Sequence, residues 1–545
     1  MHPDIPAIDT WDCLFERAEK PFPDDHIIFK SPSGVRTYKE IRPRAQNFGA
    51  HLQSKWKWSK GDVLLTFSPN YLDAPSVYWG CHWAGGIVSP ANPTYTADEL
   101  KYQIIDSNAK AIVVHVSLRE TALAAAKLVG FPTSNIWVMG ASSSVADLQH
   151  VESMLSVPTT AGSRPTINPA IDTAYLVYSS GTTGSPKGAM VTHTNVVADI
   201  ILQRLVEGEH LDWKKDRFLA LIPTYHIFGL ICLVHFPALM GLQTVIMQKF
   251  SVNEFLKNVK KESITHVYVA PPIVLYLAKN PSMTREHLSS LRMVTSGGAP
   301  LAPDLIRTVY DRLKIPVRQA FGLTESTAVA HIQRWNQWRE AMGSNGPPMP
   351  TVEVKFLNEE GTQIHEGEGE LCLRGPTIFR GYHNNAEATA RSITPDGWFM
   401  SGDVGYQDQG GNLYITDRLK DLIKFKGFQI PPAEIEGVLH EHPLVHDAAV
   451  IGVFVPEIAS EVPLAYVVLA KTSQSPEQVA RELLAHVAEK LTVQKRIRGG
   501  IIPIAEIPKG PSGKILKRVL RARAEGVDKG KALGAAIYDE RSSKL

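Results

Sequence analysis

The chain has 545 residues, of which 44% are hydrophobic and 21% are charged, and its 57 basic and 55 acidic side chains leave a net charge of +2. This composition is that of an ordinary globular protein, and the near-neutral balance gives no reason to expect nucleic acid as a partner. The length exceeds that of one hydrophobic core and predicts about three or four structural units. The four cysteines are far apart and form no CxxC pair, so we expect buried free thiols and no disulfide framework.

The first part of the chain alternates between predicted strands and helices. Residues 63–67 and 111–116 are short apolar runs that predict strands, and residues 71–84 and 96–107 predict helices between them. This alternation predicts a doubly wound α/β fold. Residues 141–169 are rich in Ser, Thr, Pro and Ala, and predict an exposed connection.

A glycine-rich loop follows the next predicted strand, residues 174–178. The loop reads Ser179-Ser180-Gly181-Thr182-Thr183-Gly184-Ser185-Pro186-Lys187-Gly188, and a helical pattern begins at about Thr194. Glycines allow a tight turn whose free N–H groups and hydroxyls can surround a phosphate, and Lys187 adds a positive charge. Strand, glycine loop and helix form the usual setting of a phosphate-binding site. The spacing of a Walker A loop is absent, and the alternative interpretation is a surface linker.

A second βα series follows the loop, with predicted strands at residues 219–222, 244–247, 266–270 and 292–295. Ligands of doubly wound sheets bind at the C-terminal ends of the strands. Three motifs fall at such ends: Pro223-Thr-Tyr-His226-Ile227-Phe228-Gly229, Ser296-Gly297-Gly298-Ala299-Pro300 and Gln319-Ala320-Phe321-Gly322-Leu-Thr324-Glu325.

The apolar stretch 218–247 could be mistaken for a membrane span. It is interrupted by Pro223, His226, His235 and Gly241, whose polar groups a helix in lipid would have to satisfy internally. We therefore expect a core strand, a loop and a buried helix there, and no membrane span.

The periodicity changes after about Ile332. Residues 352–356 and 369–374 alternate between apolar and polar side chains and predict a small, mostly antiparallel β-barrel. A charged segment, residues 417–430, then precedes an α+β pattern that continues to the end of the chain. We place a domain boundary at residues 418–421.

Seven segments resemble, in order, the motifs of the adenylate-forming superfamily, which includes acyl-CoA synthetases, 4-coumarate–CoA ligases, beetle luciferases and peptide-synthetase adenylation domains. They are residues 178–188, 223–226, 321–325, 369–375, 397–403, 417–420 and 508–514. The resemblance covers nearly the whole chain and is greatest to the acyl-CoA ligases similar to 4-coumarate–CoA ligase. Two residues depart from the family pattern: Phe321 stands where Tyr is usual, and Ser401 where Thr is common.

The resemblance implies a fold and a two-step reaction. The expected fold is α/β: a large N-terminal domain (1–417) with two doubly wound α/β subdomains plus a small β-barrel, a hinge (418–421) and a small mobile α+β C-terminal domain (422–530). In the reaction, a carboxylate attacks the α-phosphate of ATP to give acyl-AMP and pyrophosphate, and the thiol of coenzyme A then displaces AMP. The expected cofactors are ATP, Mg²⁺ and coenzyme A.

The resemblance also assigns roles to individual residues. Lys514 becomes the lysine that stabilises negative charge at the α-phosphate, where a lone exposed lysine would otherwise be a solvated charge. Asp403 would accept hydrogen bonds from the ribose hydroxyls, and Glu325 would hold Mg²⁺. Lys420 takes the hinge position, since the C-terminal domain must swing between the two steps.

The complete set of expected site residues follows these roles. The catalytic residues are Lys514, Thr324, Glu325 and His226; the ATP- and AMP-binding residues are Ser179, Ser180, Gly181, Thr182, Thr183, Gly184, Lys187, Gln319, Ala320, Phe321, Gly322, Thr324, Asp403, Arg418, Lys424 and Gln429; coenzyme A would contact Lys426 and Gly427; and the substrate pocket is lined by Ile227, Phe228, Gly297, Gly298, Ala328 and Val329.

These pocket residues are small or apolar, so we expect an aryl acid, similar to cinnamate or phenylacetate, or a medium-chain acid as substrate. Three alternatives remain: a luciferase-like oxygenase, an adenylation enzyme that loads a carrier protein, and a catalytically inactive nucleotide-binding protein. Intact Lys187, Glu325, Asp403 and Lys514 argue against the last of these.

The final tripeptide, Ser543-Lys544-Leu545, matches a peroxisomal address, and a polar segment (531–545) precedes and includes it. We therefore expect the peroxisomal import receptor as a partner and the peroxisome as the location. We expect a monomer or a weak homodimer.

Overall fold

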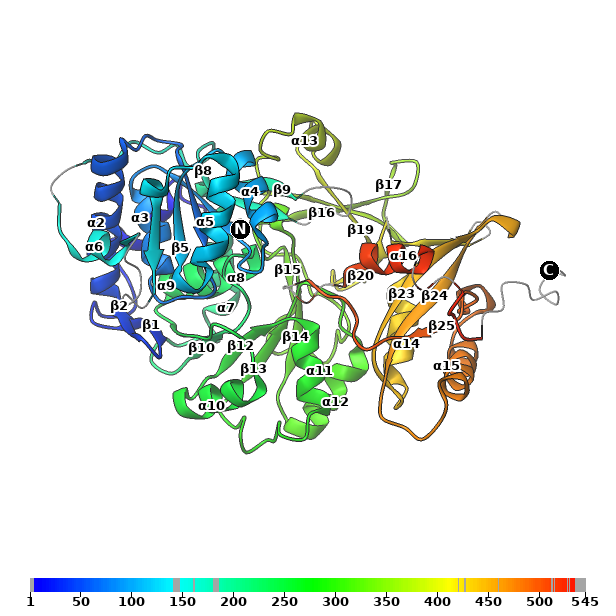
Figure 1. The fold of residues 1–545 in the computed structure, drawn as a ribbon. Coiled ribbons are helices and arrows are strands. Elements are labelled where there is room, and N and C mark those ends of the chain that lie inside the picture. The colour runs from blue at the N-terminus through cyan, green and yellow to red at the C-terminus, as the bar shows by residue number, and fades with distance from the viewer. Residues whose placement is uncertain are drawn as a thin grey trace. The chain divides into compact units, whose positions relative to one another are not determined.

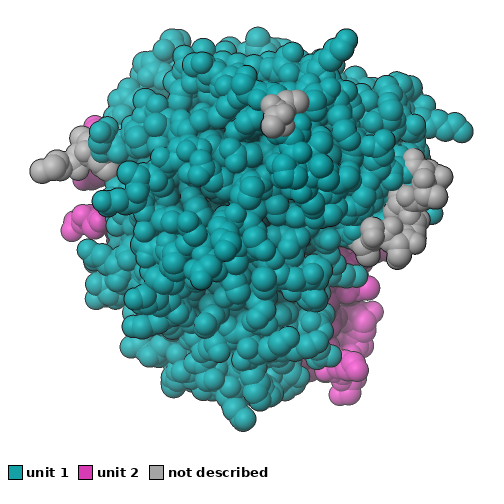
Figure 2. Space-filling model, turned by 90° about the vertical axis from the view of Figure 1, so that its left-hand side faces the viewer, with its two compact units in different colours: residues 1–298, 305–354, 373–400 teal, residues 299–304, 355–372, 401–545 magenta. Residues whose placement is uncertain are grey.

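Two mostly parallel sheets form the larger part of the computed structural model (Figure 1). The structure describes residues 4–140, 148–159, 162–179, 186–419, 421–425, 428–458, 460–510, 513, 515–526, 528 and 530–534. The chain divides into two compact units, coloured separately in Figure 2. The first unit comprises residues 1–298, 305–354 and 373–400, and the second comprises residues 299–304, 355–372 and 401–545.

The first sheet has seven strands in the order β7-β6-β5-β3-β4-β8-β9. They are β3 (Val63–Phe67), β4 (Ile87–Ala91), β5 (Ala109–His115), β6 (Ile136–Met139), β7 (Gln149–His150), β8 (Thr173–Ser179) and β9 (Lys187–Thr192). All pairs are parallel except β8 with β9. Every residue of β3 is buried, which explains its continuous apolar run, since a central parallel strand is covered on both faces.

The second sheet has eight strands in the order β15-β14-β13-β12-β10-β11-β1-β2. They are β1 (Ile27–Ser31), β2 (Gly34–Thr37), β10 (Arg217–Ala220), β11 (Gln243–Ile246), β12 (His266–Val269), β13 (Met293–Ser296), β14 (Val317–Phe321) and β15 (His331–Ile332). Only the edge strands β2 and β15 pair antiparallel to their neighbours. The predicted α/β class is confirmed.

The early strands β1 and β2 complete the second sheet and not the first. Phe29 of β1 pairs in parallel with Thr244 of β11, and Figure 1 shows the blue strands beside the green ones. The first part of the chain, for which the sequence predicts a doubly wound α/β fold, therefore contributes strands to both sheets. Parallel pairing joins segments that are far apart in the sequence, so no local sequence pattern predicts which strands become neighbours.

Helices connect many of the strands in residues 1–400. They are α1 (Thr10–Phe15), α2 (Tyr38–Trp56), α3 (Ala74–Trp83), α4 (Ala97–Asp106), α5 (Arg119–Val129), α6 (Glu152–Ser156), α7 (His193–Glu207), α8 (Ile227–Leu230), the π-helix η3 (Ile231–His235), α9 (Phe236–Met240), α10 (Val252–Glu262), α11 (Pro271–Lys279), α12 (Pro303–Leu313) and α13 (Ala386–Ser392). Their ends follow local signals: α4, for example, begins after Thr96, which forms a capping box with Glu99. Among the described residues, no helix combines the length and apolar character needed to cross a bilayer.

The glycine-rich loop joins two antiparallel strands. The helix predicted from about Thr194 is confirmed, since α7 begins at His193, but the strand β9, which the sequence did not predict, lies between the loop and this helix. Residues Gly188 to Val191 pair with the end of β8, and Thr192 then caps α7 through a hydrogen bond from the Asn195 N–H. The described residues on either side of the loop consequently pair as antiparallel strands, and α7 follows β9.

The expected small barrel is a five-stranded sheet in the order β17-β16-β18-β19-β20. Its strands are β16 (Glu353–Leu357), β17 (Gln363–Ile364), β18 (Gly369–Arg374), β19 (Phe399–Gln407) and β20 (Leu413–Arg418). The pairs β16–β17 and β19–β20 are antiparallel, as predicted. Among the described residues the strands form a linear order with β17 and β20 at its ends.

The C-terminal part of the second unit is α+β, as predicted. It contains the hairpin β21 (Ile423–Phe425) and β22 (Phe428–Ile430), the sheet of β23 (Val445–Val455), β24 (Ser460–Leu469) and β25 (Ile501–Pro503), and the helices α14 (Pro432–Glu441), α15 (Pro476–Lys490) and α16 (Lys517–Glu525). One face of this sheet packs against Leu439 of α14 and Leu483 of α15. The opposite face, with Tyr466, packs against Leu520 of α16.

A fully buried ion pair in the first unit joins helix α7 to strand β14 of the second sheet. Arg318 of β14 donates to both carboxylate oxygens of Glu207, the last residue of α7, at 2.9 and 2.7 Å, and the side chains are 0% and 1% exposed. Trp335 Nε1 donates to the same carboxylate at 2.6 Å, and Arg318 Nε donates to Thr295 Oγ1 at 2.9 Å. These extra hydrogen bonds are what makes a buried charge pair tolerable.

Three buried histidines meet near the N-terminal helix α1. Thr10 Oγ1 lies 3.0 Å from Nδ1 of His82 and 3.0 Å from Nδ1 of His193. Trp79 Nε1 donates to Nδ1 of His235, so the neutral ring carries its proton on Nε2, which lies 2.7 Å from Tyr175 Oη. Burial lowers the pKa of each ring, that of His193 to about 3. Each histidine is therefore uncharged in the folded protein.

The first unit should lose stability in mild acid. Burial also lowers the pKa of His266 and His331, so five histidines must shed a proton on folding below pH 6.5. Each costs about 2 kcal/mol at pH 5, because the unfolded chain binds the proton and the folded chain does not. Asp199, whose pKa burial raises to about 8, acts in the opposite direction but is one group against five. Urea unfolding followed by tryptophan fluorescence at pH 7 and pH 5 measures the effect, and equal unfolding free energies would contradict it.

Candidate active site

Helix α4 holds both ends of the glycine-rich loop. Tyr178 Oη donates a hydrogen bond to Asp106 Oδ2 at 2.6 Å, and Tyr102 Oη donates to the Pro186 carbonyl at 2.9 Å. Burial and the Asp106 carboxylate raise the pKa of Tyr178, so its hydroxyl keeps its proton. A Cβ at Gly188 would lie 3.1 Å from the Tyr178 ring, which favours glycine there. The predicted phosphate-binding residues Ser180, Gly181, Thr182, Thr183 and Gly184 lie outside the described residues.

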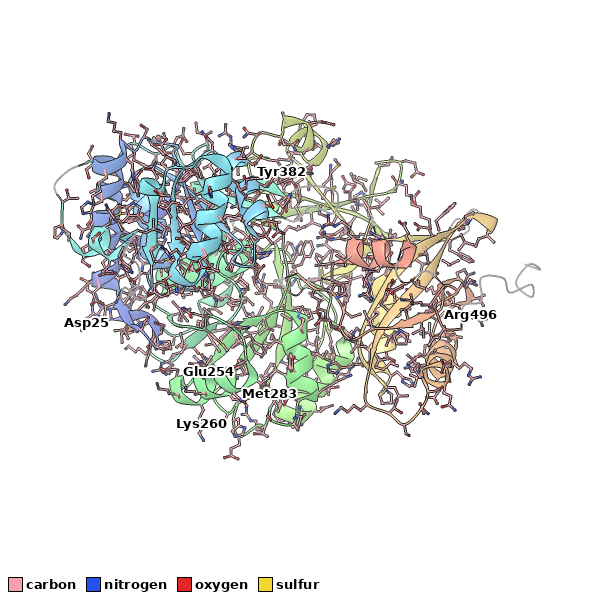
Figure 3. The ribbon with its side chains drawn as sticks, in the orientation of Figure 1. Asp25, Glu254, Lys260, Met283, Tyr382 and Arg496 are labelled. Carbon is pink, nitrogen blue, oxygen red and sulfur yellow. The ribbon has the colours of Figure 1, made fainter. Side chains whose placement is uncertain are left out.

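Two of the predicted site segments, residues 178–188 and 321–325, meet at Tyr382, which lies between β18 and α13 and is labelled in Figure 3. Tyr382 Oη donates to Oε1 of Glu325 at 2.7 Å, and Ser179 Oγ donates to the same oxygen at 3.3 Å. Lys187 Nζ lies 5.1 Å from the centroid of the Tyr382 ring. The structure thus brings Ser179, Lys187 and Glu325 to one place, as the sequence predicts for residues that share a substrate.

Tyr382 was not among the predicted site residues. It follows Glu325 by 57 positions, and no spacing in the sequence joins the two. Burial first, and then the Glu325 carboxylate, raise the pKa of this tyrosine, so the hydroxyl remains a hydrogen-bond donor.

The turn η4 (Thr324–Ser326) carries Thr324 and Glu325, both buried. The chain then folds back through Thr327 and Ala328, whose φ values of 54° and 84° are unusual for residues other than glycine. A Cβ at Gly322 would lie 1.5 Å from the Ala328 carbonyl oxygen, so only glycine permits this close return.

Two hydrogen bonds hold this unusual backbone. Thr327 Oγ1 donates to the Thr377 carbonyl at 2.7 Å, and the Val329 N–H donates to Oδ2 of Asp199 at 3.0 Å. Asp199 is fully buried on α7 and also accepts a hydrogen bond from Gln203. Asp199 was not among the predicted site residues. A charged residue in the middle of an apolar helix face is the sequence feature that could have indicated its structural role.

The predicted substrate-pocket residues lie on helix α8, directly after strand β13 and shortly after the turn η4. A Cβ at Gly297 would lie 3.2 Å from Cζ of Phe228 and 3.3 Å from the Ala320 carbonyl oxygen, so Gly297 gives the Phe228 ring its space. The Phe228 ring also meets the buried Tyr268 edge to face, with 5.6 Å between centroids. Ile227, Ala328 and Val329 are buried, and Gly298 has a φ of 84°.

Several predicted nucleotide and catalytic residues carry structural contacts. His226 caps α8 by accepting a hydrogen bond from the Phe228 N–H at 3.4 Å. Gln319 donates through Nε2 to the Ser344 carbonyl, so its side chain packs within the unit. The Phe321 ring contacts His331, with 6.0 Å between centroids.

In the second unit, the structure pairs Asp403 with Arg418. They are register partners on β19 and β20, and Arg418 Nε lies 2.9 Å from Oδ1 of Asp403. Asp403 is almost fully buried, and its N–H donates to Ser401 Oγ at 3.1 Å. The Ser401 hydroxyl in turn donates to the Leu371 carbonyl at 2.7 Å, so serine supplies the hydroxyl expected at this position.

Two of the remaining predicted residues, Lys424 and Gln429, lie on the paired strands β21 and β22. Lys424 and Gln429 are register partners there, and the Lys424 side chain is exposed. The predicted hinge residue Lys420, the predicted coenzyme A contacts Lys426 and Gly427, and the predicted catalytic lysine Lys514 lie outside the described residues.

The donor set near Glu325 fits a metal that arrives with a nucleotide. Within the described part of the chain, no group of three or more His, Cys, Asp or Glu side chains could hold a metal ion. A single buried carboxylate such as Glu325 matches the preference of Mg²⁺ for one or two carboxylates plus phosphate oxygens and water.

Comparison with protein families and with known proteins identifies the family of this chain. The model of the AMP-binding enzyme family matches residues 15–383, and that of the AMP-binding enzyme C-terminal domain matches residues 434–514. 4-Coumarate–CoA ligase 3 of Oryza sativa subsp. japonica is 35% identical over 508 residues, 92% of this chain and 89% of the relative. 4-Coumarate–CoA ligase of Pinus taeda is 35% identical over 500 residues, 90% of each chain.

A solved structure agrees with these relatives. The crystal structure of ATP-bound MatB from Rhodopseudomonas palustris superposes with a TM-score of 0.84 at 26% identity, covering 96% of this chain and 99% of that one. The chain therefore belongs to the AMP-binding enzyme family, in the adenylate-forming superfamily and close to its 4-coumarate–CoA ligase branch, and is an enzyme of the AMP-forming acid–CoA ligase class.

Proposed function

We propose that the protein joins an aryl or medium-chain carboxylic acid to coenzyme A through an acyl-adenylate, with ATP and Mg²⁺. The observation that carries this proposal is the meeting of Ser179, Lys187 and Glu325 at Tyr382, beside the glycine-rich loop. Hydroxyl, ammonium and carboxylate groups at one loop suit a nucleotide that brings phosphates and a metal ion.

In the first step, a carboxylate oxygen of the acid attacks the α-phosphorus and the bond to pyrophosphate breaks. Negative charge grows on the phosphate oxygens, and the ammonium groups of Lys187 and Lys514 stabilise it. Thr324 donates its hydroxyl to the α-phosphate. When bound, Mg²⁺ neutralises phosphate charge, and Glu325 is the residue that would hold it.

Asp403 binds the ribose through its two oxygens, which suit two hydroxyl donors. The Arg418 guanidinium, 2.9 Å from Oδ1 of Asp403, fixes the orientation of this carboxylate. In the second step the thiol of coenzyme A displaces AMP, and we assign Lys426 and Gly427 to its approach and Lys420 to the hinge.

The pocket residues indicate the chemical class of the acid substrate and not the individual acid. Ile227, Phe228, Ala328 and Val329 supply apolar surface, and the absence of a side chain at Gly297 leaves space for the Phe228 ring itself. Such a wall favours an aryl or aliphatic acyl group over a strongly polar one.

The first test measures thioester formation with ATP, Mg²⁺ and coenzyme A across cinnamic, phenylacetic and benzoic acids and a series of fatty acids. We expect one acid class to be preferred at least about tenfold in kcat/KM, because a misfit in an apolar pocket costs roughly 1–3 kcal/mol. Acyl-AMP without a coenzyme A product would favour a carrier-loading enzyme, or a luciferase-like oxygenase if light accompanies it. No ATP turnover with any acid would contradict the proposal.

The two steps should separate in two variants. Lys514→Ala should lower ATP–pyrophosphate exchange by about a hundredfold or more, because it removes a cation from the developing charge. Lys420→Pro should leave exchange nearly intact and stop thioester formation, because proline fixes φ near about −65°. Unchanged ATP–pyrophosphate exchange in Lys514→Ala would contradict the catalytic role of Lys514. Equal loss of both steps in Lys420→Pro would contradict the hinge role of Lys420.

We further propose that Ser543-Lys544-Leu545 directs the protein to peroxisomes through the import receptor, and that the enzyme is a monomer or weak homodimer. The full chain with an N-terminal fluorescent tag should colocalise with a peroxisomal marker, and deletion of Leu545 should leave it in the cytosol. Identical distributions of the two proteins would contradict the signal.

A further inference from the structure

Two donors occupy the same oxygen of Glu325. The hydroxyl of Tyr382 donates to Oε1 at 2.7 Å, and that of Ser179 donates to Oε1 at 3.3 Å. Within the described residues, the other oxygen, Oε2, accepts no side-chain hydrogen bond. The backbone of Glu325 is fixed as well, since its carbonyl accepts a hydrogen bond from the Phe379 N–H at 2.9 Å.

Tyr382 is itself held rigidly. It forms an antiparallel bridge with Ala189 of β9, and the His383 N–H donates to the Gly188 carbonyl at 2.8 Å. Its own N–H donates to Thr389 Oγ1 at 2.9 Å, and its ring packs edge to face on Phe379. The ring is therefore fixed to the strand that leads out of the glycine-rich loop.

The face of the same ring lies near Lys187. The ammonium nitrogen is 5.1 Å from the ring centroid, within the range of a cation–π contact. One side chain thus contacts a carboxylate through its hydroxyl and a cation through its ring, and both of these groups belong to the predicted phosphate and metal site.

We propose that Tyr382 is a positioning residue that reserves Oε2 of Glu325 for Mg²⁺ and aligns Lys187 with the nucleotide phosphates. The proposal rests on the proposed function, because it assumes that nucleotide and metal bind here. Hydrogen bonds to a carboxylate oxygen compete with metal coordination by that oxygen, so the donors on Oε1 direct the metal to Oε2 alone.

Two substitutions separate the two contacts. Tyr382→Phe removes the hydroxyl and keeps the ring beside Lys187, whereas Tyr382→Leu removes both. Binding is measured directly with Mn²⁺ as the probe, by electron paramagnetic resonance of the full chain with an ATP analogue whose α and β phosphorus atoms are joined by methylene. ATP–pyrophosphate exchange is measured in parallel as a function of free Mg²⁺.

We expect Tyr382→Phe to weaken Mn²⁺ binding about tenfold, the size of one hydrogen bond to a charged group, with the KM for ATP changed less than about twofold. Tyr382→Leu should weaken Mn²⁺ binding similarly and also raise the KM for ATP, because Lys187 loses the ring. Mn²⁺ affinity equal to that of the wild type in Tyr382→Phe would overturn the proposal.

Tyr38→Phe is a matched control. Tyr38 is another buried tyrosine of the first unit, and its hydroxyl donates to the Leu14 carbonyl. This variant should lose comparable stability and keep wild-type Mn²⁺ binding, and weakened binding there would show that the effect is a general loss of structure. Ser179→Ala tests the other donor if Tyr382→Phe does not fold: its bond to Oε1 is longer, so we expect a loss of about twofold to threefold, and no loss overturns the proposal.

The measurements distinguish this proposal from the proposed function. A wild-type protein that shows no exchange with any acid fails the proposed function, whatever the variants do. A wild-type protein that exchanges, with a Tyr382→Phe variant of identical Mg²⁺ and Mn²⁺ dependence, fails only the role of Tyr382.

Discussion

The buried ion pair between Glu207 and Arg318 is the interaction on which the geometry of the first unit depends. Helix α7 begins directly after β9, the strand that leaves the glycine-rich loop, and Glu207 is its last residue; Arg318 lies on β14, which leads to Phe321 and the turn that carries Glu325. Removing one partner would leave a full charge in the core, which costs far more than the pair contributes. Glu207 is held from three sides by Arg318, Trp335 and the end of α7, so the helix cannot slide along the strand. The two segments that supply the phosphate-binding and metal-binding groups therefore keep a fixed separation, and Asp199, on the same helix, extends this support to the backbone at Val329.

The elements that could be predicted from the sequence are those whose signal is local. Residues 63–67 form a strand because a central parallel strand buries both faces, and α4 begins where Thr96 and Glu99 form a capping box. The pairing of Phe29 with Thr244 has no local signal, because it depends on which edge of a finished sheet remains open. The strand β9 was missed for a related reason: its apolar run is short and lies between a glycine-rich loop and a strong helix pattern, and pairing with β8 decides its structure.

The same distinction applies to the site. The sequence motifs predict Ser179, Lys187 and Glu325 as site residues, and the structure brings these three together in the first unit. The motifs also predict Asp403 and Arg418, which form an ion pair in the second unit. The side chain of His226 caps a helix, and that of Gln319 donates to a backbone carbonyl within the unit. The residue type alone does not reveal which of several possible contacts a polar side chain makes. Tyr382 and Asp199 could not be assigned from the sequence, because a lone tyrosine after a turn and a lone aspartate in a helix acquire meaning only from the partners that folding supplies.

The four cysteines have a consequence for the chemical behaviour of the whole chain. All are buried and free, and burial raises the pKa of each thiol, that of Cys13 to about 11 and that of Cys372 to about 12. Alkylating reagents and disulfides react with the thiolate, so the folded protein presents neither the accessible nor the ionised form of sulfur that they require. Cys13, Cys81 and Cys232 belong to the first unit and Cys372 to the second. Covalent labelling of each cysteine consequently measures how often its own unit opens, and native thiols can report the separate opening rates of the two units without any engineered probe.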